Sequence, residues 1–345
     1  MKAAIYRGKE NVTIEERPVP SCGPRDVLLK TVYASVCGTD AAVYRHGPGT
    51  GHRITVGSEF GHEAVCRVAE VGAEVTDFHV GQRVYPYPLL VTGDTSRAGT
   101  MGAFSEYILA RDAKLGVGLY PVPDEIEDRT AALIEPFTVG TRAARRSQPQ
   151  QGENAIVFGA GTIGIAAAIA LKEFGCGGVL VCDVSPLRLK IAERLGFPVC
   201  NSSEEDVRQT AAGLFGTAPG LGGPTANADI YVDAAGAEGL LELFQDMGKI
   251  GSRMVVVAVL TGKRPVDILH MTYAQQSLIG SGGYFPEDVA AVMKVMADGN
   301  YDIASIFTHE FPHSELVRAL ELAGRPDEAL NVVIRFENEH GAEIK

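Results

Sequence analysis

The sequence predicts an α/β protein of two domains: a doubly wound parallel sheet with helices on both faces, and a mostly β domain built as a partly open barrel. Three observations lead to this prediction. The chain has 345 residues, more than the roughly 150 that one domain usually holds. Its first part consists of short β-type runs between turns, whereas compact apolar runs alternate with helical patterns from about residue 150.

Residues 1–148 form the first expected domain. Glycine and proline separate its short runs of β-branched and aromatic residues, a pattern typical of irregular β structure with little helix. The runs are residues 2–6, 11–16, 26–34, 63–71 and 82–87.

Residues 149–284 form the second expected domain. Strands that are apolar on both faces are typical of a parallel sheet buried between helices. Such runs lie at residues 154–159, 178–183, 228–236 and 253–260, and helical patterns lie at 163–175 and 187–196. Residues 216–228 are dense in glycine and proline and are expected to form a loop.

Residues 285–345 return to a mixed pattern. A helix is expected over 286–299, because Pro286 suits a first helical turn and Gly299 suits a helix end. A second helix is expected over 313–324 and a closing strand over 329–336. The tail is therefore expected to rejoin the first domain, with the parallel-sheet domain inserted between its two parts.

The composition excludes several classes of protein. Apolar residues make up 46% of the chain and charged residues 21%, which excludes a disordered chain. The net charge of -12 repels phosphate backbones and disfavours a nucleic-acid partner. The longest apolar stretch is under half of the roughly 20 residues that a membrane span needs, and the start lacks the apolar core of a signal peptide. We expect a cytoplasmic protein whose six dispersed cysteines are reduced.

A glycine-rich turn predicts a dinucleotide site. Gly159, Gly161 and Gly164 have the spacing GxGxxG between an expected strand and an expected helix, with Thr162 and Ile163 inside the motif. In the Rossmann fold the first glycine permits a tight turn, the second leaves room for a pyrophosphate, and the third lets the helix pack on the sheet. The helix N-terminus then faces the anion.

The next expected strand ends in Asp183, 22 residues beyond Gly161. A carboxylate at that point bonds the adenosine ribose and repels a 2′-phosphate, so NAD is favoured over NADP. Arg188 follows and could stack near the adenine or tolerate a phosphate. In the alternative interpretation Asp183 caps a helix and Arg188 is a solvated surface residue.

Separate polar segments of the first domain could hold a metal ion. They offer the thiol of Cys37, the imidazole of His62 and the carboxylates of Glu63 and Glu135. Three such ligands with a fourth position open to substrate are typical of catalytic zinc. No paired CxxC spacing supports the site. On residues alone, a buried thiol and a hydrogen-bonded core histidine explain Cys37 and His62 about as well.

Five motifs in order extend over essentially the whole chain: CGTD, VGSEFGHE, EPFTVGTRA, VFGAGTIG and DVSPLRL. Together they resemble the zinc-dependent medium-chain dehydrogenase/reductase superfamily. The resemblance is greatest to the sorbitol, 2,3-butanediol and threonine dehydrogenase branch, because Glu135 stands where other alcohol dehydrogenases carry a cysteine. It implies a Rossmann domain, a GroES-like β domain, and a homodimer or homotetramer.

The resemblance also implies residue roles. Cys37 and His62 would bind zinc, and Glu63 and Glu135 would share the remaining role, one directly and the other through water or by exchange. The role of a positioning residue falls to Asp40, which would accept the second ring N–H of His62.

Thr39 would receive the substrate's hydroxyl proton in a short relay. Two departures from the resemblance matter. Residues 85–107 contain no cysteine, where many relatives hold a structural zinc with four, so one zinc is expected. Ala42 stands where many relatives have a histidine, so the relay must end sooner.

A metal site and a nicotinamide site together predict hydride transfer between an alcohol and NAD, with zinc acidifying the hydroxyl. The resemblance implies that the substrate is a secondary alcohol such as a polyol, cyclitol or vicinal diol. A bulkier apolar alcohol such as a hydroxysteroid is an alternative, because apolar residues could line a pocket near Tyr85, Tyr87, Leu89, Leu90 and Met101, although core or interface explains such residues more often. Two further hypotheses are a zinc-free quinone or enone reductase and a non-catalytic NAD-binding protein.

Overall fold

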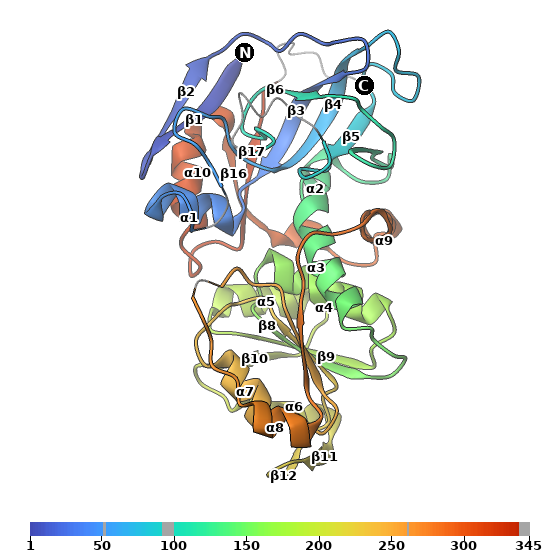
Figure 1. Cartoon of the computed structure of the whole chain (residues 1–345), viewed down its shortest axis with the longest axis vertical. Coiled ribbons are helices and arrows are strands. Elements are labelled where there is room, and N and C mark those ends of the chain that lie inside the picture. Colours follow the sequence, from blue (N-terminus) through green and yellow to red (C-terminus); the bar gives the residue numbers. More distant parts are fainter. Residues whose placement is uncertain (51–52, 92–99, 261, 338–345) are drawn as a thin grey trace. The chain divides into compact units, whose positions relative to one another are not determined.

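The computed structural model describes residues 1–50, 53–91, 100–260 and 262–337. The chain forms two compact units (Figure 1). The first comprises Met1–Glu135, Met296–Gly299 and the residues from Phe307 onward, and the second comprises Pro136–Val295 and Asn300–Ile306. None of the helices in the described part combines the length and the apolar character that a bilayer crossing needs. The domain boundaries expected at residues 148 and 284 stay a prediction.

The first unit contains a seven-stranded sheet in the order β16-β17-β3-β4-β5-β7, with β6 also paired to β3. Strands β16 and β17 run parallel, and the other pairs of this sheet are antiparallel. Strands β1 and β2 form a separate antiparallel pair. The strands are β1 (Lys2–Gly8), β2 (Asn11–Glu16), β3 (Val27–Ser35), β4 (Glu63–Val71), β5 (Arg83–Pro86), β6 (Tyr107–Ala110), β7 (Leu119–Pro121), β16 (Phe307–Pro312) and β17 (Asn331–Arg335).

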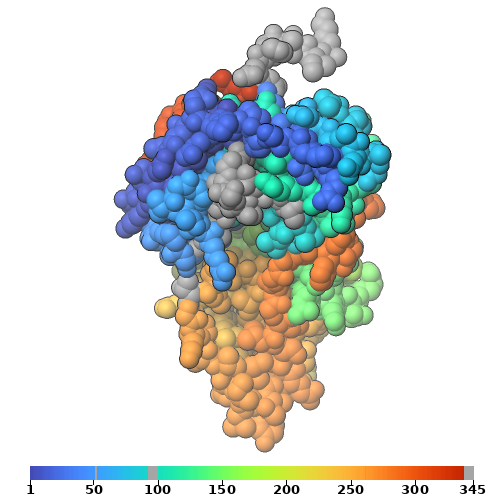
Figure 2. Space-filling model, turned by 45° about the horizontal axis from the view of Figure 1, so that its top comes forward, coloured from blue at the N-terminus to red at the C-terminus, as the bar shows by residue number. Residues whose placement is uncertain are grey.

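Short helices lie between these strands: α1 (Gly38–His46), α2 (Asp128–Ala131), the 3₁₀ turn η2 (His313–Glu315) and α10 (Leu316–Ala323). The core packs aromatic rings edge to face, with ring centroids of Phe60 and Phe104 5.1 Å apart. Residues 13–26, in dark blue in Figure 2, lie at the surface and are half-buried or exposed. Helix α1 follows directly on β3, so the sequence between Ser35 and Gly38 lies at the edge of this core.

The second unit contains a six-stranded sheet in the order β10-β9-β8-β13-β14-β15, and all of its strand pairs are parallel. Its strands are β8 (Asn154–Phe158), β9 (Gly178–Asp183), β10 (Val199–Asn201), β13 (Ile230–Asp233), β14 (Arg253–Val256) and β15 (Ser277–Gly280). The helices are α3 (Ile134–Arg146), α4 (Thr162–Glu173), α5 (Pro186–Arg194), α6 (Val207–Phe215), α7 (Leu240–Met247), α8 (Ile268–Ala274), α9 (Pro286–Asp298) and the 3₁₀ turn η1 (Ile303–Ile306); α3 and α9 extend into the first unit.

Successive side chains of β8 point to opposite faces of this sheet, and helices cover both faces. Ile156 and Phe158 belong to one apolar cluster with residues of α6 and α7. Val157 points to the other face, where its Cγ1 lies 3.5 Å from the position that a Cβ on Gly164 of α4 would take. The predicted fold class, a doubly wound parallel sheet with a second, mostly β domain, is therefore confirmed.

One local prediction is wrong. Residues 216–228 form a two-stranded hairpin of β11 (Thr217–Gly220) and β12 (Gly223–Ala226) instead of a loop. The hairpin is tied to the rest of the unit by the hydroxyl of Thr225, which donates to the backbone carbonyl of Met247 at 2.6 Å. Tertiary hydrogen bonding therefore outweighs the weak β propensity of glycine and proline here.

His313 predicts a pH dependence of stability. Its ring is buried, stacks on Phe336 with centroids 4.5 Å apart, and places Nε2 2.9 Å from the carbonyl oxygen of Phe104. Burial lowers the pKa of His313 below its ordinary value of 6.5. Protons therefore bind the unfolded chain more tightly, so the contribution of His313 is complete above about pH 6.5 and is lost as the pH falls below it.

We expect a His313→Gln variant to be less stable than the wild type near neutral pH, but to lose less stability on acidification. Urea unfolding midpoints at about pH 7.5 and about pH 5.5 measure this, the two values lying on either side of the ordinary histidine pKa. An equal loss in both proteins would show that His313 is not the group responsible.

Candidate metal centre and cofactor site

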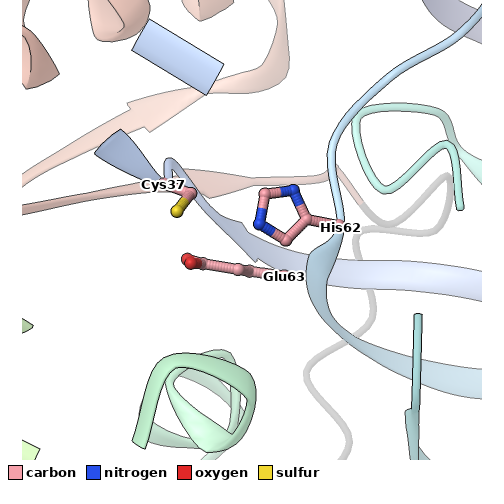
Figure 3. Close-up of side chains that lie close together, drawn as sticks. All are labelled: Cys37, His62 and Glu63. Atoms are coloured by element: carbon pink, nitrogen blue, oxygen red, sulfur yellow. The ribbon is translucent and has the colours of Figure 1, made fainter. Parts of the chain in front are cut away.

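The register of β3 and β4 brings three candidate ligands together. Ser35, the last residue of β3, pairs directly with Glu63, the first residue of β4. Cys37 follows β3 by two residues and His62 precedes β4 by one, so both lie at the same end of the strand pair. Figure 3 shows the Cys37 sulfur, one ring nitrogen of His62 and the Glu63 carboxylate pointing toward one another.

Gly61 explains why His62 can turn toward this site. Its φ is +95°, and a Cβ there would lie 2.7 Å from Cδ2 and 2.9 Å from the backbone nitrogen of Phe104. The backbone of Phe60 accepts a hydrogen bond from Phe104 at 3.1 Å, and that of Gly61 accepts one from Ala103 at 3.0 Å. Only glycine combines this left-handed conformation with so close a backbone approach.

The three ligand atoms form a compact group. A ligand atom from each of Cys37, His62 and Glu63 lies within 4.8 Å of the other two. Cys37 and His62 are half-buried and Glu63 is buried, with 2% of its surface exposed. A thiol, an imidazole and a carboxylate leave one position of a tetrahedral zinc open. Among the described residues, Glu135 is not part of this group.

Asp40 joins the ring of His62 to the start of α1. Its Oδ1 lies 3.4 Å from Nδ1 of His62, and its Oδ2 accepts a hydrogen bond from the backbone nitrogen of Cys37 at 3.1 Å. Asp40 is fully buried and stands at the third position of a helix whose N-cap is Cys37. One carboxylate thus caps the helix and orients the histidine, leaving Nε2 for the site.

Burial and mutual charge shift the pKa values of all three groups. Burial and the neighbouring charge of Glu63 raise the pKa of Cys37 to about 11. Burial also raises the pKa of Glu63, against the opposing influence of His62 and of a hydrogen bond from Ser35. Burial lowers the pKa of His62, but the charge of Asp40 and its hydrogen bond outweigh it and raise the pKa well above the ordinary value. The thiol and the ring therefore keep their protons until a cation displaces them.

Glu63 gives the clearest indication that a cation fits here. Its Oε2 is buried and has no hydrogen-bond partner among the described residues. Leaving such an oxygen unsatisfied costs about 1–3 kcal/mol, and more when it is charged. A divalent ion between the thiol, the imidazole and this oxygen removes that cost, whereas a simple core position for Glu63 leaves it in place. The donor set suits zinc better than magnesium or calcium, because it contains a thiol.

The remaining candidates occupy different positions. Glu135 is buried in the first turn of α3, and Thr39 is half-buried in the first turn of α1. Their roles stay predictions. Of the apolar residues considered as a pocket lining, three are buried and two are exposed: Tyr85, Tyr87 and Met101 on the one hand, Leu89 and Leu90 on the other.

Sequence patterns do not single out Ser35, although it contacts the candidate site. It pairs directly with Glu63 across the sheet, its hydroxyl lowers the pKa of the Glu63 carboxyl, and it is fully buried. The available signal was a polar residue at the end of a strand that is otherwise largely apolar, two positions before Cys37. A serine in that place is also common in cores, so the signal does not separate a site residue from an ordinary one.

The glycine turn of the second unit has the geometry of a phosphate cradle. Gly159 has a φ of +100° and lies against the backbone of residues 234–235. A Cβ on Gly164 would lie 1.7 Å from the carbonyl oxygen of Gly159, so the helix packs directly on the turn. Helix α4 begins with Gly161 as N-cap and has no acidic residue in its first turn, which is fully described. Its N-terminal amides therefore attract an anion.

Asp183 holds this turn in place. Its Oδ2 accepts a hydrogen bond from the backbone nitrogen of Ala160 at 2.6 Å, and its Oδ1 accepts from Val184 and Ser185 at 2.8 Å each. Nη1 of Arg188 lies 3.7 Å from the position that a Cβ on Gly161 would take. A carboxylate that organises the turn and a guanidinium beside it are thus both near the expected cofactor.

The comparisons with known proteins agree with this geometry. Residues 23–124 match the family described as "Alcohol dehydrogenase GroES-like domain", and residues 162–298 match "Zinc-binding dehydrogenase". The L-threonine 3-dehydrogenase of Rhizobium johnstonii is 28% identical, with 90% of this chain and 91% of the relative covered. The sorbitol dehydrogenase of Bacillus subtilis is 26% identical, with 97% of each covered. The structure of 2R,3R-butanediol dehydrogenase from Bacillus subtilis has a TM-score of 0.83 at 25% identity and covers 98% of this chain and 99% of that one.

The cluster predicts one bound zinc per chain that depends on Cys37. We expect Cys37→Ala to weaken zinc binding by about 100-fold or more, since roughly 10–16 kcal/mol of zinc affinity is shared among about four ligands. Cys66→Ala is the control: Cys66 is a buried cysteine on β4 in the same unit, and it lies outside the cluster. Zinc content after dialysis against a metal buffer measures both. Retention of zinc by Cys37→Ala would contradict the assignment.

Gly161 offers a test of the cofactor site that spares the fold. Its φ of -73° is open to alanine, and a Cβ would meet only the Arg188 side chain, at 3.7 Å, among the described atoms. We expect Gly161→Ala to fold normally and to bind NADH about tenfold less tightly, or worse, a loss of about 1.4 kcal/mol, because the methyl group occupies the place of the pyrophosphate.

Gly213→Ala on α6 is the control, since a Cβ there meets nothing within 4 Å. The chain has no tryptophan, so the emission of NADH itself reports binding. Equal NADH affinity in Gly161→Ala and Gly213→Ala would contradict a pyrophosphate at this turn.

Proposed function

Because this chain belongs to the zinc-binding medium-chain dehydrogenase family, and is therefore a zinc-dependent alcohol or polyol dehydrogenase, we propose that it transfers hydride between a small secondary alcohol and NAD. The substrate class that we propose carries a hydroxyl or similar polar group next to the reacting carbon, as polyols, cyclitols and vicinal diols do. The convergence of Cys37, His62 and Glu63, with a buried carboxylate oxygen left for a cation, is the observation that carries this proposal.

The relatives support the substrate class. Sorbitol and butanediol are alcohols with adjacent hydroxyl groups, and threonine carries its hydroxyl next to an amino-bearing carbon; these are the substrates after which the relatives are named. At about 28% identity, the relatives support this class of substrate and do not select one substrate within it.

In this proposal the residues of the first unit hold the metal and move the proton. Cys37, His62 and Glu63 bind a single zinc, which lowers the pKa of the substrate hydroxyl when it is bound. Asp40 fixes the ring of His62 so that Nε2 faces the ion. Thr39, in the first turn of α1, receives the hydroxyl proton, and Glu135 acts by exchange with Glu63.

The residues of the second unit bind the dinucleotide. The turn of Gly159, Gly161 and Gly164, with Thr162 and Ile163, takes the pyrophosphate at the N-terminus of α4. Asp183 faces the adenosine ribose, and its negative charge disfavours a 2′-phosphate. Arg188 lies over the same turn and lines the adenosine site, so NAD is the preferred cofactor and NADP the poorer one.

A homodimer or homotetramer is part of the proposal. Strand β15 ends the six-stranded sheet, so its outer edge is paired to no strand among the described residues. Helix α8 precedes it and exposes about two thirds of Ile268, Leu269 and Tyr273. An exposed apolar surface beside a free strand edge is typical of a contact between subunits.

A panel of alcohols tests the proposed function. We expect zinc-replete protein to reduce NAD with at least one polyol, cyclitol, vicinal diol or amino alcohol, with kcat/KM at least about tenfold above that for the matching primary alcohol, or about 1.4 kcal/mol. Chelation should abolish the rate and added zinc restore it. No oxidation across the panel, or an enone reduction that survives chelation, would contradict the proposal.

A further inference from the structure

Three polar side chains form a buried row across the sheet of the first unit. Strand β3 lies between β4 and β17. Ser35 pairs directly with Glu63 on one side and with Val333 on the other. Directly opposed residues share a face of the sheet, and so does the residue two positions along. The register therefore places Asn331, Ser35 and Glu63 on one face.

A hydrogen bond joins Asn331 to Ser35, and direct cross-strand pairing places Ser35 against Glu63. Nδ2 of Asn331 donates to Oγ of Ser35 at 2.9 Å. Ser35 has a single hydroxyl proton, and because Asn331 occupies a lone pair of its oxygen, that proton is available to the carboxylate of Glu63 directly opposite, whose pKa the Ser35 hydroxyl lowers. Asn331 and Ser35 are 4% and 0% exposed, so water does not compete for the Ser35 hydroxyl.

The row holds Glu63 in one rotamer. Ser35 lies directly opposite Glu63 on the neighbouring strand, while Oε2 of Glu63 stays without a hydrogen-bond partner among the described residues and the carboxylate is buried beside Cys37 and His62. Asn331 is itself fixed, because it begins β17 and its backbone carbonyl accepts a bond from the hydroxyl of Thr308 at 3.0 Å. Neighbours on a rigid sheet restrict the rotamers of this carboxylate, so moving it away from the ion costs free energy.

We infer that Asn331 and Ser35 are positioning residues that keep Glu63 as a direct ligand of the zinc ion. The inference rests on the proposed function, since it takes the zinc site as given. Asn331 acts only through Ser35, and Ser35 acts only through Glu63. Without the row, Glu63 turns away, and the ion loses one protein ligand to water.

Three variants and one control test the inference. Ser35→Ala removes the hydroxyl, Asn331→Leu removes its donor with little change of volume, and the double variant removes both. Thr31→Val is the matched control: Thr31 is a second buried hydroxyl on β3, and it donates to the backbone carbonyl of Ser105 at 2.8 Å, away from the cluster. Zinc affinity is measured by competition with a chromophoric chelator, and coordination by the visible absorption of the cobalt(II)-substituted protein.

We expect Ser35→Ala to weaken zinc binding by about 10- to 100-fold, the usual range for residues that orient metal ligands. Its cobalt spectrum should differ from that of the wild type, because water takes the place of the Glu63 carboxylate. Asn331→Leu should shift both readouts in the same direction by less. The double variant should match Ser35→Ala within about twofold, because the two residues act in series, and Thr31→Val should match the wild type.

The inference is overturned if Ser35→Ala keeps wild-type zinc affinity and cobalt spectrum, or if the two single losses multiply in the double variant. If circular dichroism shows that Ser35→Ala does not fold, the test rests on Asn331→Leu. Its zinc affinity and cobalt spectrum are then compared with those of Thr31→Val, and equal values overturn the inference. These readouts need no substrate. Protein that loses zinc as expected but oxidises no alcohol refutes the proposed function and supports the inference; protein that oxidises alcohols while Ser35→Ala binds zinc normally refutes the inference alone.

Discussion

The antiparallel pairing of β3 with β4 is the constraint on which the candidate site depends. Because Ser35 lies opposite Glu63, the residues just beyond one strand and just before the other meet at a single point. A slip of one residue would turn Glu63 to the opposite face and part it from Cys37. Gly61 then allows the chain to approach Phe104 closely enough to aim His62 inward. The candidate ligands Cys37, His62 and Glu63 come from separate parts of the sequence and are thus neighbours at one end of the strand pair.

The site is costly for the fold without a ligand, which separates it from an ordinary core. A buried carboxylate oxygen without a hydrogen-bond partner in the described part of the chain, a thiol with its pKa raised to about 11, and a half-buried histidine beside a fully buried aspartate lie within one small volume. Packing alone gives no reason to gather such groups. A divalent cation neutralises their charges and satisfies their lone pairs, so the arrangement is explained by function.

The sequence predicts the fold class well because its two parts contain different patterns of apolar residues. Apolar runs such as those of β8 and β9 indicate a buried parallel sheet, and the spacing of Gly159, Gly161 and Gly164 indicates a turn that the structure contains. Helix α1 was harder to predict: its cap is a cysteine, and the bond from the Cys37 backbone to Asp40 shows only in three dimensions. Ser35 and Asn331 are 296 positions apart, so no local pattern could join them, and motif resemblance alone could not choose between Glu63 and Glu135.

X-ray absorption at the zinc edge tests the central claim most directly, because it counts the atoms around the metal without a substrate. A site of Cys37, His62 and Glu63 predicts one sulfur at about 2.3 Å and nitrogen or oxygen neighbours at about 2.0–2.2 Å. A spectrum without sulfur, or with several sulfurs, would show that the ion is held elsewhere in the chain.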